Sequence, residues 1–105
     1  MKTALEKNGF DTAVAEDGAS GLDKARALKP DVILMDVVMP GLNGFQATRE
    51  LARNPDTSDI PVIIVTTKGL KTDRIWGMRQ GAVEYLVKPV SEAALVDCAR
   101  AVIRH

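Results

Sequence analysis

Three polar residues of different chemistry each close an apolar run of this sequence, in the order Asp36, Thr66 and Lys88. A carboxylate can attack phosphorus and form an acyl phosphate. An ammonium group can neutralise phosphoryl oxygens as a point charge, and a hydroxyl can donate a hydrogen bond to one of them. Each residue type alone more often has a structural role at a strand end, but the three together predict a site for phosphoryl transfer.

The elements that must position these residues alternate between helix and strand. Residues 32–35 and 62–65 are apolar throughout, which is typical of parallel strands buried on both faces. Two further strands are predicted at residues 12–15 and 83–87. Apolar periodicity, with stops at glycine or proline, predicts helices at residues 1–8, 19–28, 45–53, 71–80 and 92–104.

This order of elements predicts an α/β fold. Helical crossovers between buried strands are right-handed and build a parallel sheet that helices cover on both faces. The length of 105 residues suits a single domain over residues 1–105. Ligands of such sheets bind at the carboxyl ends of the strands, so Asp36, Thr66 and Lys88 are expected to lie close together.

Composition narrows the function classes. Fourteen basic and 14 acidic residues give a formal net charge of zero, without the basic excess of non-specific nucleic-acid binders. No apolar run approaches the ~20 residues of a membrane helix. Cys98 is the only cysteine, which excludes an intrachain disulfide and favours a reducing, cytoplasmic setting. We expect its thiol to be a packing or neutral group.

Three stretches carry a family resemblance: DVILMDVVMPGLNG, IPVIIVTT and GAVEYLVKPV. They resemble the receiver domains of response regulators, the CheY-like family with a flavodoxin-like fold, and the match covers essentially the whole chain. The stretch MPGLNGFQATREL and the neighbourhood of Trp76 and Gly77 are most similar to single-domain regulators of type IV pilus twitching motility.

The resemblance implies a role for each residue of the site. Asp36 resembles the phosphoacceptor, Thr66 the switch hydroxyl and Lys88 the lysine that pairs with the phosphate. Tyr85 resembles the aromatic switch residue that turns inward when the hydroxyl shifts, although a tyrosine in a strand is often a packing residue. Lys88–Pro89 resembles the family's cis peptide.

The resemblance also implies a Mg²⁺ site. Asp36 and the backbone carbonyl of Val38 resemble two of its ligands. Receiver domains begin with one more strand, which is central and ends in an acidic metal-binding pair, whereas this sequence begins within the segment that matches the first helix. We therefore expect four strands with the first one missing, weak Mg²⁺ binding, and slow or absent phosphorylation. The pair Glu16–Asp17 follows a different strand and is not assigned the metal role.

The family's strand order puts the missing strand between residues 12–15 and 32–36. Its absence predicts a gap of roughly 9–10 Å unless the sheet closes up. Because exposed strand edges pair with other chains, we expect a homodimer or another rearrangement with exchange of a strand or helix.

The function implied by the resemblance is two-component signal transduction. The protein is expected to accept a phosphoryl group from a histidine kinase or phosphotransfer protein, and to signal by contact with a downstream protein through its last two helices and last strand. An alternative is a phosphorylation-independent interaction module, or a truncated receiver that dimerises. An ordinary enzyme is not expected, because the sequence has no G-x-S-x-G elbow or nucleotide-binding glycine motif and its only histidine is His105.

Trp76 lies on the predicted helix at residues 71–80. The sequence leaves two equal alternatives for its indole, exposure at a partner surface or packing in the core.

Overall fold

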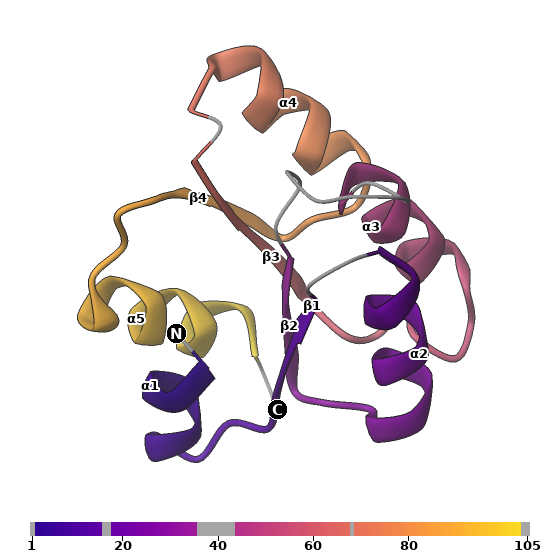
Figure 1. Ribbon diagram of the computed structural model, residues 1–105, viewed down its shortest axis with the longest axis horizontal. Helices are drawn as coiled ribbons and strands as arrows, with labels where there is room; N and C mark the ends of the chain where they lie inside the picture. The colour runs from indigo at the N-terminus through magenta and orange to yellow at the C-terminus, as the bar shows by residue number, and fades with distance from the viewer. Residues whose placement is uncertain (1, 16–17, 36–43, 68, 104–105) are drawn as a thin grey trace.

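The computed structural model describes residues 2–15, 18–35, 44–67 and 69–103, which form helices and strands in strict alternation. The helices are α1 (Lys2–Lys7), α2 (Gly18–Leu28), α3 (Gly44–Arg53), α4 (Lys71–Arg79) and α5 (Glu92–Val102). The strands are β1 (Thr12–Ala15), β2 (Val32–Met35), β3 (Val62–Thr66) and β4 (Glu84–Val87). The sheet lies between helices on its two sides, with α1 and α5 together on one side and α2 and α3 on the other (Figure 1).

The four strands form one parallel sheet in the order β1-β2-β3-β4. The central strands β2 and β3 are buried along their whole length, as their continuous apolar sequences predict. This confirms the α/β fold class expected from the order of the elements.

The core divides into two clusters, one on each face of the sheet, because successive side chains of a strand point to opposite faces. One face packs against α2 and α3 through Ile33, Met35, Ile64 and the helical residues Ala25, Ala47 and Leu51. The other face packs against α1 and α5 through Val32, Leu34, Ile63, Val65 and the helical residues Leu5, Leu95 and Ala99. The helices therefore hold the sheet from both sides, so its strand ends are fixed in place.

The gap expected between residues 12–15 and 32–36 is not present. β1 pairs directly with β2 in parallel, from Thr12 opposite Val32 to Ala15 opposite Met35. The sheet has closed up, which satisfies the backbone groups that a gap would have left unpaired. The exposed central edge that motivated the dimer prediction is thus absent from the described residues, and the oligomeric state itself stays a prediction.

Every predicted element is present, and the bounds differ by at most two residues. Thr66, expected just after its strand, is the last residue of β3, and the final helix ends at Val102 rather than at residue 104. Gly9 and Gly81 follow α1 and α4 with φ of 86° and 111°, the left-handed conformation in which glycine ends helices without strain. None of the described helices has the length and apolar character needed to cross a lipid bilayer.

The start of α5 offers a test of local stability. The Ser91 hydroxyl accepts a hydrogen bond from the backbone N–H of Ala94 at 3.1 Å, which satisfies one of the unpaired donors at the helix start. Ser91→Ala should lower the free energy of unfolding by about 1 kcal/mol, measured by urea denaturation. The matched control is Ser58→Ala, an exposed serine that makes no side-chain hydrogen bond within the described part of the chain. An equal loss in both variants would contradict the capping role.

Candidate functional site

Two of the three predicted site residues meet at the carboxyl edge of the sheet. Thr66 ends β3, and Lys88 follows β4 directly. The two strands are paired in parallel with Thr66 opposite Val87, and the Lys88 N–H donates to the Thr66 carbonyl oxygen at 2.8 Å. The Thr66 side chain is fully buried at 0% exposure, whereas Lys88 is half-buried. A hydroxyl and an ammonium group are thus held by adjacent strand ends.

The third residue, Asp36, lies outside the described residues, as does Val38. Asp36 follows Met35, the last residue of β2. Met35 pairs with Ile64 in β3, two residues before Thr66. β2 therefore leads the chain to the same edge of the sheet at which Thr66 and Lys88 lie.

The turn after β4 contains the expected cis peptide bond between Lys88 and Pro89. A shallow pocket of about 480 Å³ lies here, lined by Thr67, Lys88, Pro89 and Val90. Its position beside the lysine makes it part of the same candidate site.

Tyr85 is buried at 1% exposure and packs into the cluster of apolar residues on the α2 and α3 face of the sheet. Gly77 of α4 lies directly over its ring. A Cβ added at Gly77 would sit 2.9 Å from Tyr85 Cδ2 and 2.9 Å from Ile64 Cδ1. The buried position of the ring is consistent with both alternatives for Tyr85. It fits a switch residue in its inward position, and it fits a packing residue.

Gly77 contacts the Tyr85 ring, and the sequence pattern did not predict a role for it. Glycine lowers helix stability by about 1 kcal/mol relative to alanine, so a glycine within the α4 pattern indicates a packing reason. That signal was present in the sequence, but which residue approaches Gly77 depends on the tertiary structure. Here α4 comes so close to the sheet that no side chain fits between them.

α4 and β4 are also joined on their outer side. The Arg74 guanidinium lies 3.3 Å from the Glu84 carboxylate, and that carboxylate accepts the Tyr85 N–H at 3.0 Å. Since Arg74 is well exposed, the pair contributes at most about 1 kcal/mol. Its effect is to hold the exposed side of α4 beside the strand that carries Tyr85.

Mg²⁺ requires several oxygen ligands in near-octahedral geometry. Within the part of the chain that the structure describes, no group of three or more acidic, histidine or cysteine side chains could hold a metal ion. The expected ligands, Asp36 and the Val38 carbonyl, lie outside that part. The described residues therefore do not make a magnesium site by themselves.

Trp76 and Cys98 differ in their surroundings. Trp76 is 51% exposed on α4, which favours the surface alternative over core packing. Cys98 is half-buried against the cluster beneath α1 and α5. Burial, and next the negative charge of Glu84, raise the pKa of the Cys98 thiol. The thiol is thus protonated at neutral pH, as expected for a packing group.

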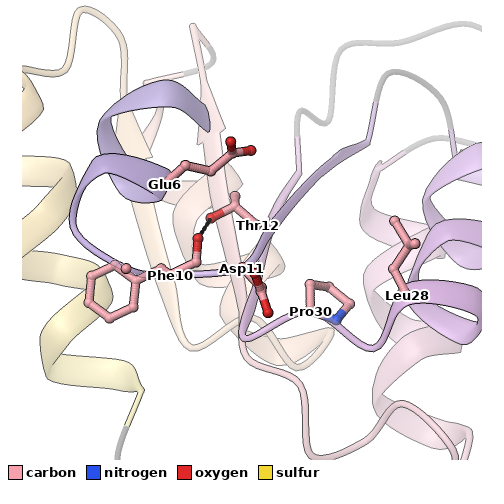
Figure 2. A pocket seen from close by; sticks show the side chains of 7 residues that line it. Glu6, Phe10, Asp11, Thr12, Leu28 and Pro30 are labelled. Atoms are coloured by element: carbon pink, nitrogen blue, oxygen red, sulfur yellow. Dashed lines mark hydrogen bonds between the residues drawn. The ribbon is translucent and has the colours of Figure 1, made fainter.

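A second pocket lies at the opposite, amino end of β1 (Figure 2). It measures about 590 Å³ and is lined by Glu6, Gly9, Phe10, Asp11, Thr12, Leu28 and Pro30. The Thr12 hydroxyl donates to the Phe10 carbonyl oxygen at 3.3 Å (Figure 2). None of the predicted site residues lines this pocket, so it is separate from the candidate phosphorylation site.

Comparison with known proteins gives the class of protein. Residues 1–100 match the response regulator receiver domain, and the chain belongs to this family. It is 59% identical over 103 residues to Protein PilH of Pseudomonas aeruginosa, an alignment that covers 98% of this chain and 85% of PilH. It is also 41% identical over 101 residues to the phosphate regulon transcriptional regulatory protein PhoB of Escherichia coli, covering 96% of this chain but 44% of PhoB.

Solved receiver structures share the fold. The receiver domain of the sensor histidine kinase PA1611 from Pseudomonas aeruginosa, which has a magnesium ion coordinated in its active site cleft, superposes with a TM-score of 0.83 at 30% identity. That match covers 97% of this chain and 84% of the other. The chemotaxis protein CheY4 of Vibrio cholerae gives a TM-score of 0.84 at 29% identity, covering 96% and 84%.

These matches confirm the CheY-like receiver fold and the resemblance to the twitching-motility regulators among the receivers. The chain is a receiver domain of two-component signal transduction, a signalling regulator rather than a classical enzyme. The alternative of a phosphorylation-independent module is not favoured. Receiver domains bind Mg²⁺ at the active site, as the PA1611 domain does.

The close approach of α4 to Tyr85 can be tested with Gly77→Ala. Overpacking a core contact destabilises the fold by about 1–3 kcal/mol, whereas alanine in place of glycine stabilises a helix by about 1 kcal/mol. We expect Gly77→Ala to lower the free energy of unfolding, and the Tyr85 ring resonances to shift in NMR spectra as the ring is displaced.

The control is the same substitution in a Tyr85→Leu background, where the smaller side chain leaves room for the new methyl group. There the cost of Gly77→Ala should be smaller, with a coupling energy on the order of 0.5–3 kcal/mol between the two positions. Equal costs in both backgrounds would contradict the contact.

Proposed function

We propose that this receiver domain accepts a phosphoryl group on Asp36 from a histidine kinase or phosphotransfer protein, and then signals by contact with a downstream protein. The observation that carries the proposal is the pairing of Thr66 and Lys88 at adjacent strand ends through the 2.8 Å backbone hydrogen bond. β2, the next strand of the sheet, ends one residue before Asp36.

In the proposed reaction, a carboxylate oxygen of Asp36 attacks the phosphorus of a phosphohistidine on the partner. The phosphorus–nitrogen bond breaks as the new phosphorus–oxygen bond forms. The imidazole nitrogen keeps the electron pair and takes a proton from water, and Asp36 becomes an acyl phosphate. The charge on the transferred group is spread over its oxygens, so fixed positive charge is the main contribution that the protein can make.

Lys88 would supply that charge as an ammonium group, and the Thr66 hydroxyl would donate to a phosphoryl oxygen. Mg²⁺, when bound, adds neutralising charge at the same oxygens. We propose the Asp36 carboxylate and the Val38 carbonyl as two of its ligands. Because two oxygens leave most of an octahedral shell to water, this pair on its own would bind the ion weakly.

The proposed response to phosphorylation passes through Thr66 and Tyr85. Movement of the Thr66 hydroxyl toward the phosphoryl group would favour the inward position of the Tyr85 ring beneath α4. The contact with Gly77 and the Arg74–Glu84 pair link that ring and its strand to α4. The surface of α4, β4 and α5 is therefore the part proposed to change for the downstream partner.

We also propose that residues 1–105 act as one receiver domain in the cytoplasm, in a type IV pilus twitching-motility system. The 59% identity to PilH supports the pathway, and the single cysteine fits a reducing compartment. The neutral net charge gives no support to a nucleic-acid partner. The predicted homodimer is tested by sedimentation, in which a monomer at all concentrations would exclude it.

Phosphorylation of Asp36 is tested by the mass of the intact protein after incubation with acetyl phosphate and Mg²⁺. The unaltered chain should gain one phosphoryl group, slowly because Mg²⁺ binding is expected to be weak. Asp36→Asn should gain none, because an amide is not a nucleophile of this kind. The matched control is Asp59→Asn, which removes an exposed carboxylate from the loop before β3 and should leave the adduct unchanged. An adduct that persists in Asp36→Asn would place the phosphoacceptor elsewhere.

The role of Thr66 is tested by separating phosphorylation from the response of Tyr85. A hydrogen bond to a charged group is worth about 1.5–3 kcal/mol, so Thr66→Ala should uncouple the Tyr85 ring from the phosphoryl group. In NMR spectra, acetyl phosphate should shift the Tyr85 ring resonances in the unaltered chain and in Thr66→Ser, which keeps the hydroxyl. Thr66→Ala should still be phosphorylated but show little of this shift. A full shift without the hydroxyl would rule out the proposed switch.

A further inference from the structure

A groove between α3 and α4 lies apart from the candidate phosphorylation site. Its volume is about 450 Å³ and its lining residues are Arg49, Ala52, Arg53, Trp76, Arg79, Gln80 and Gly81. The two helices stand next to each other on the same side of the sheet (Figure 1). All lining residues come from the C-terminal halves of these helices or the turn that follows α4, whereas Thr66 and Lys88 lie at the opposite ends of the strands.

Gly81 lies where the end of α4 approaches α3 in this groove. This residue has a φ of 111°, and a Cβ added to it would lie 2.7 Å from the Cβ of Ala52. A side chain at this position would collide with α3, so glycine and the small Ala52 let the two helices approach each other here. The groove walls are therefore left to the longer side chains of the two helices.

Those walls are basic. Arg49, Arg53 and Arg79 are all exposed, and no carboxylate is among the described residues that line the groove. Within the described ranges, none of the three guanidinium groups makes an ion pair or a side-chain hydrogen bond. Since the whole chain has zero formal net charge, three arginines in one groove are a local excess of positive charge.

A role in helix stability accounts for only part of this arrangement. Arg53 and Arg79 stand in the last turns of α3 and α4, where a cation offsets the partial negative charge of the helix end. That role does not require Arg49 to line the same groove. It also gives no reason for Trp76, a large aromatic side chain, to stay 51% exposed beside the arginines.

We propose that this α3–α4 groove binds an acidic segment of a partner protein, and that it does so independently of the phosphorylation site. Carboxylates would pair with the arginines, whose planar guanidinium groups form paired hydrogen bonds with them. An apolar side chain of the segment would pack on the indole of Trp76. Arginine and tryptophan are the residue types that contribute most binding energy at protein interfaces.

The composition of the groove favours a protein over a nucleic acid. Single-stranded nucleic acids need a basic track with several aromatic side chains on which bases stack. This groove has one aromatic residue, and the chain has no basic excess outside it to extend such a track. A short acidic peptide segment matches both the charge and the size.

The fluorescence of Trp76 provides the measurement, because it is the only tryptophan of the chain. The probe is a synthetic peptide rich in glutamate with a leucine at every fourth position, added to the unphosphorylated protein at low salt. We expect a saturable change in fluorescence. The double variant Arg49→Glu/Arg79→Glu should weaken binding by at least about tenfold, because it replaces attraction with like-charge repulsion.

The matched control is Lys7→Glu/Arg26→Glu, which makes the same change of net charge at exposed positions on α1 and α2. This variant should bind the peptide within about twofold of the unaltered chain, since exposed charges far from the groove contribute little. Both variants should stay folded in urea unfolding, with a small loss of stability from the basic residues replaced in the last turns of helices, and their labelling by acetyl phosphate should match the unaltered chain. Acetyl phosphate labelling tests the phosphorylation of Asp36 separately from peptide binding to the α3–α4 groove, so failure of one proposal can be distinguished from failure of the other.

Three outcomes would overturn the proposal. The first is the lack of a saturable fluorescence change. The second is an equal loss of binding in both double variants, which would mean a general charge effect. The third is tighter binding of a thymidine oligonucleotide of equal charge with the same dependence on Arg49 and Arg79, which would make the partner a nucleic acid.

Discussion

The pairing of β2 with β3 is the interaction on which the rest of this receiver domain depends. Both strands are buried on both faces, and both are apolar except for Thr66 at the end of β3. Full burial of each isoleucine, leucine or valine contributes roughly 1.5–3 kcal/mol, so this pair of strands anchors the centre of the sheet. Because they are parallel, both strands end at the same edge of the sheet. That edge is where the residues suited to phosphoryl transfer are expected to gather.

The central pairing of β2 with β3 also determines how β4 and β1 join the sheet. β4 adds to β3 with Thr66 opposite Val87, which brings Lys88 within one backbone hydrogen bond of the threonine. On the other side, β1 pairs with β2 without a gap. A buried strand must satisfy its backbone donors and acceptors, since an unpaired buried group costs about as much as a lost hydrogen bond. Closing the sheet is the arrangement that meets this requirement within one chain.

α4 connects the two functional surfaces proposed for this domain. Gly77 allows the helix to lie against the ring of Tyr85, and Gly81, at the turn after the helix, allows close packing against Ala52 of α3. One helix therefore borders both the proposed switch residue Tyr85 and the arginine-lined groove. A shift of α4 would alter both, because side chains this tightly packed cannot move independently.

The sequence by itself determined the order of the elements, the two buried central strands, the helix stops at Gly9 and Gly81, and the family, together with the candidates Asp36, Thr66 and Lys88. These follow from local patterns of apolar residues, glycine and proline, which physical chemistry ties directly to secondary structure. Only the tertiary structure decided that β1 lies against β2, that Gly77 faces Tyr85, and that Arg49 and Arg79 share a groove. Each of these contacts joins residues distant in the sequence, and such pairings depend on how whole helices and strands pack rather than on any local pattern.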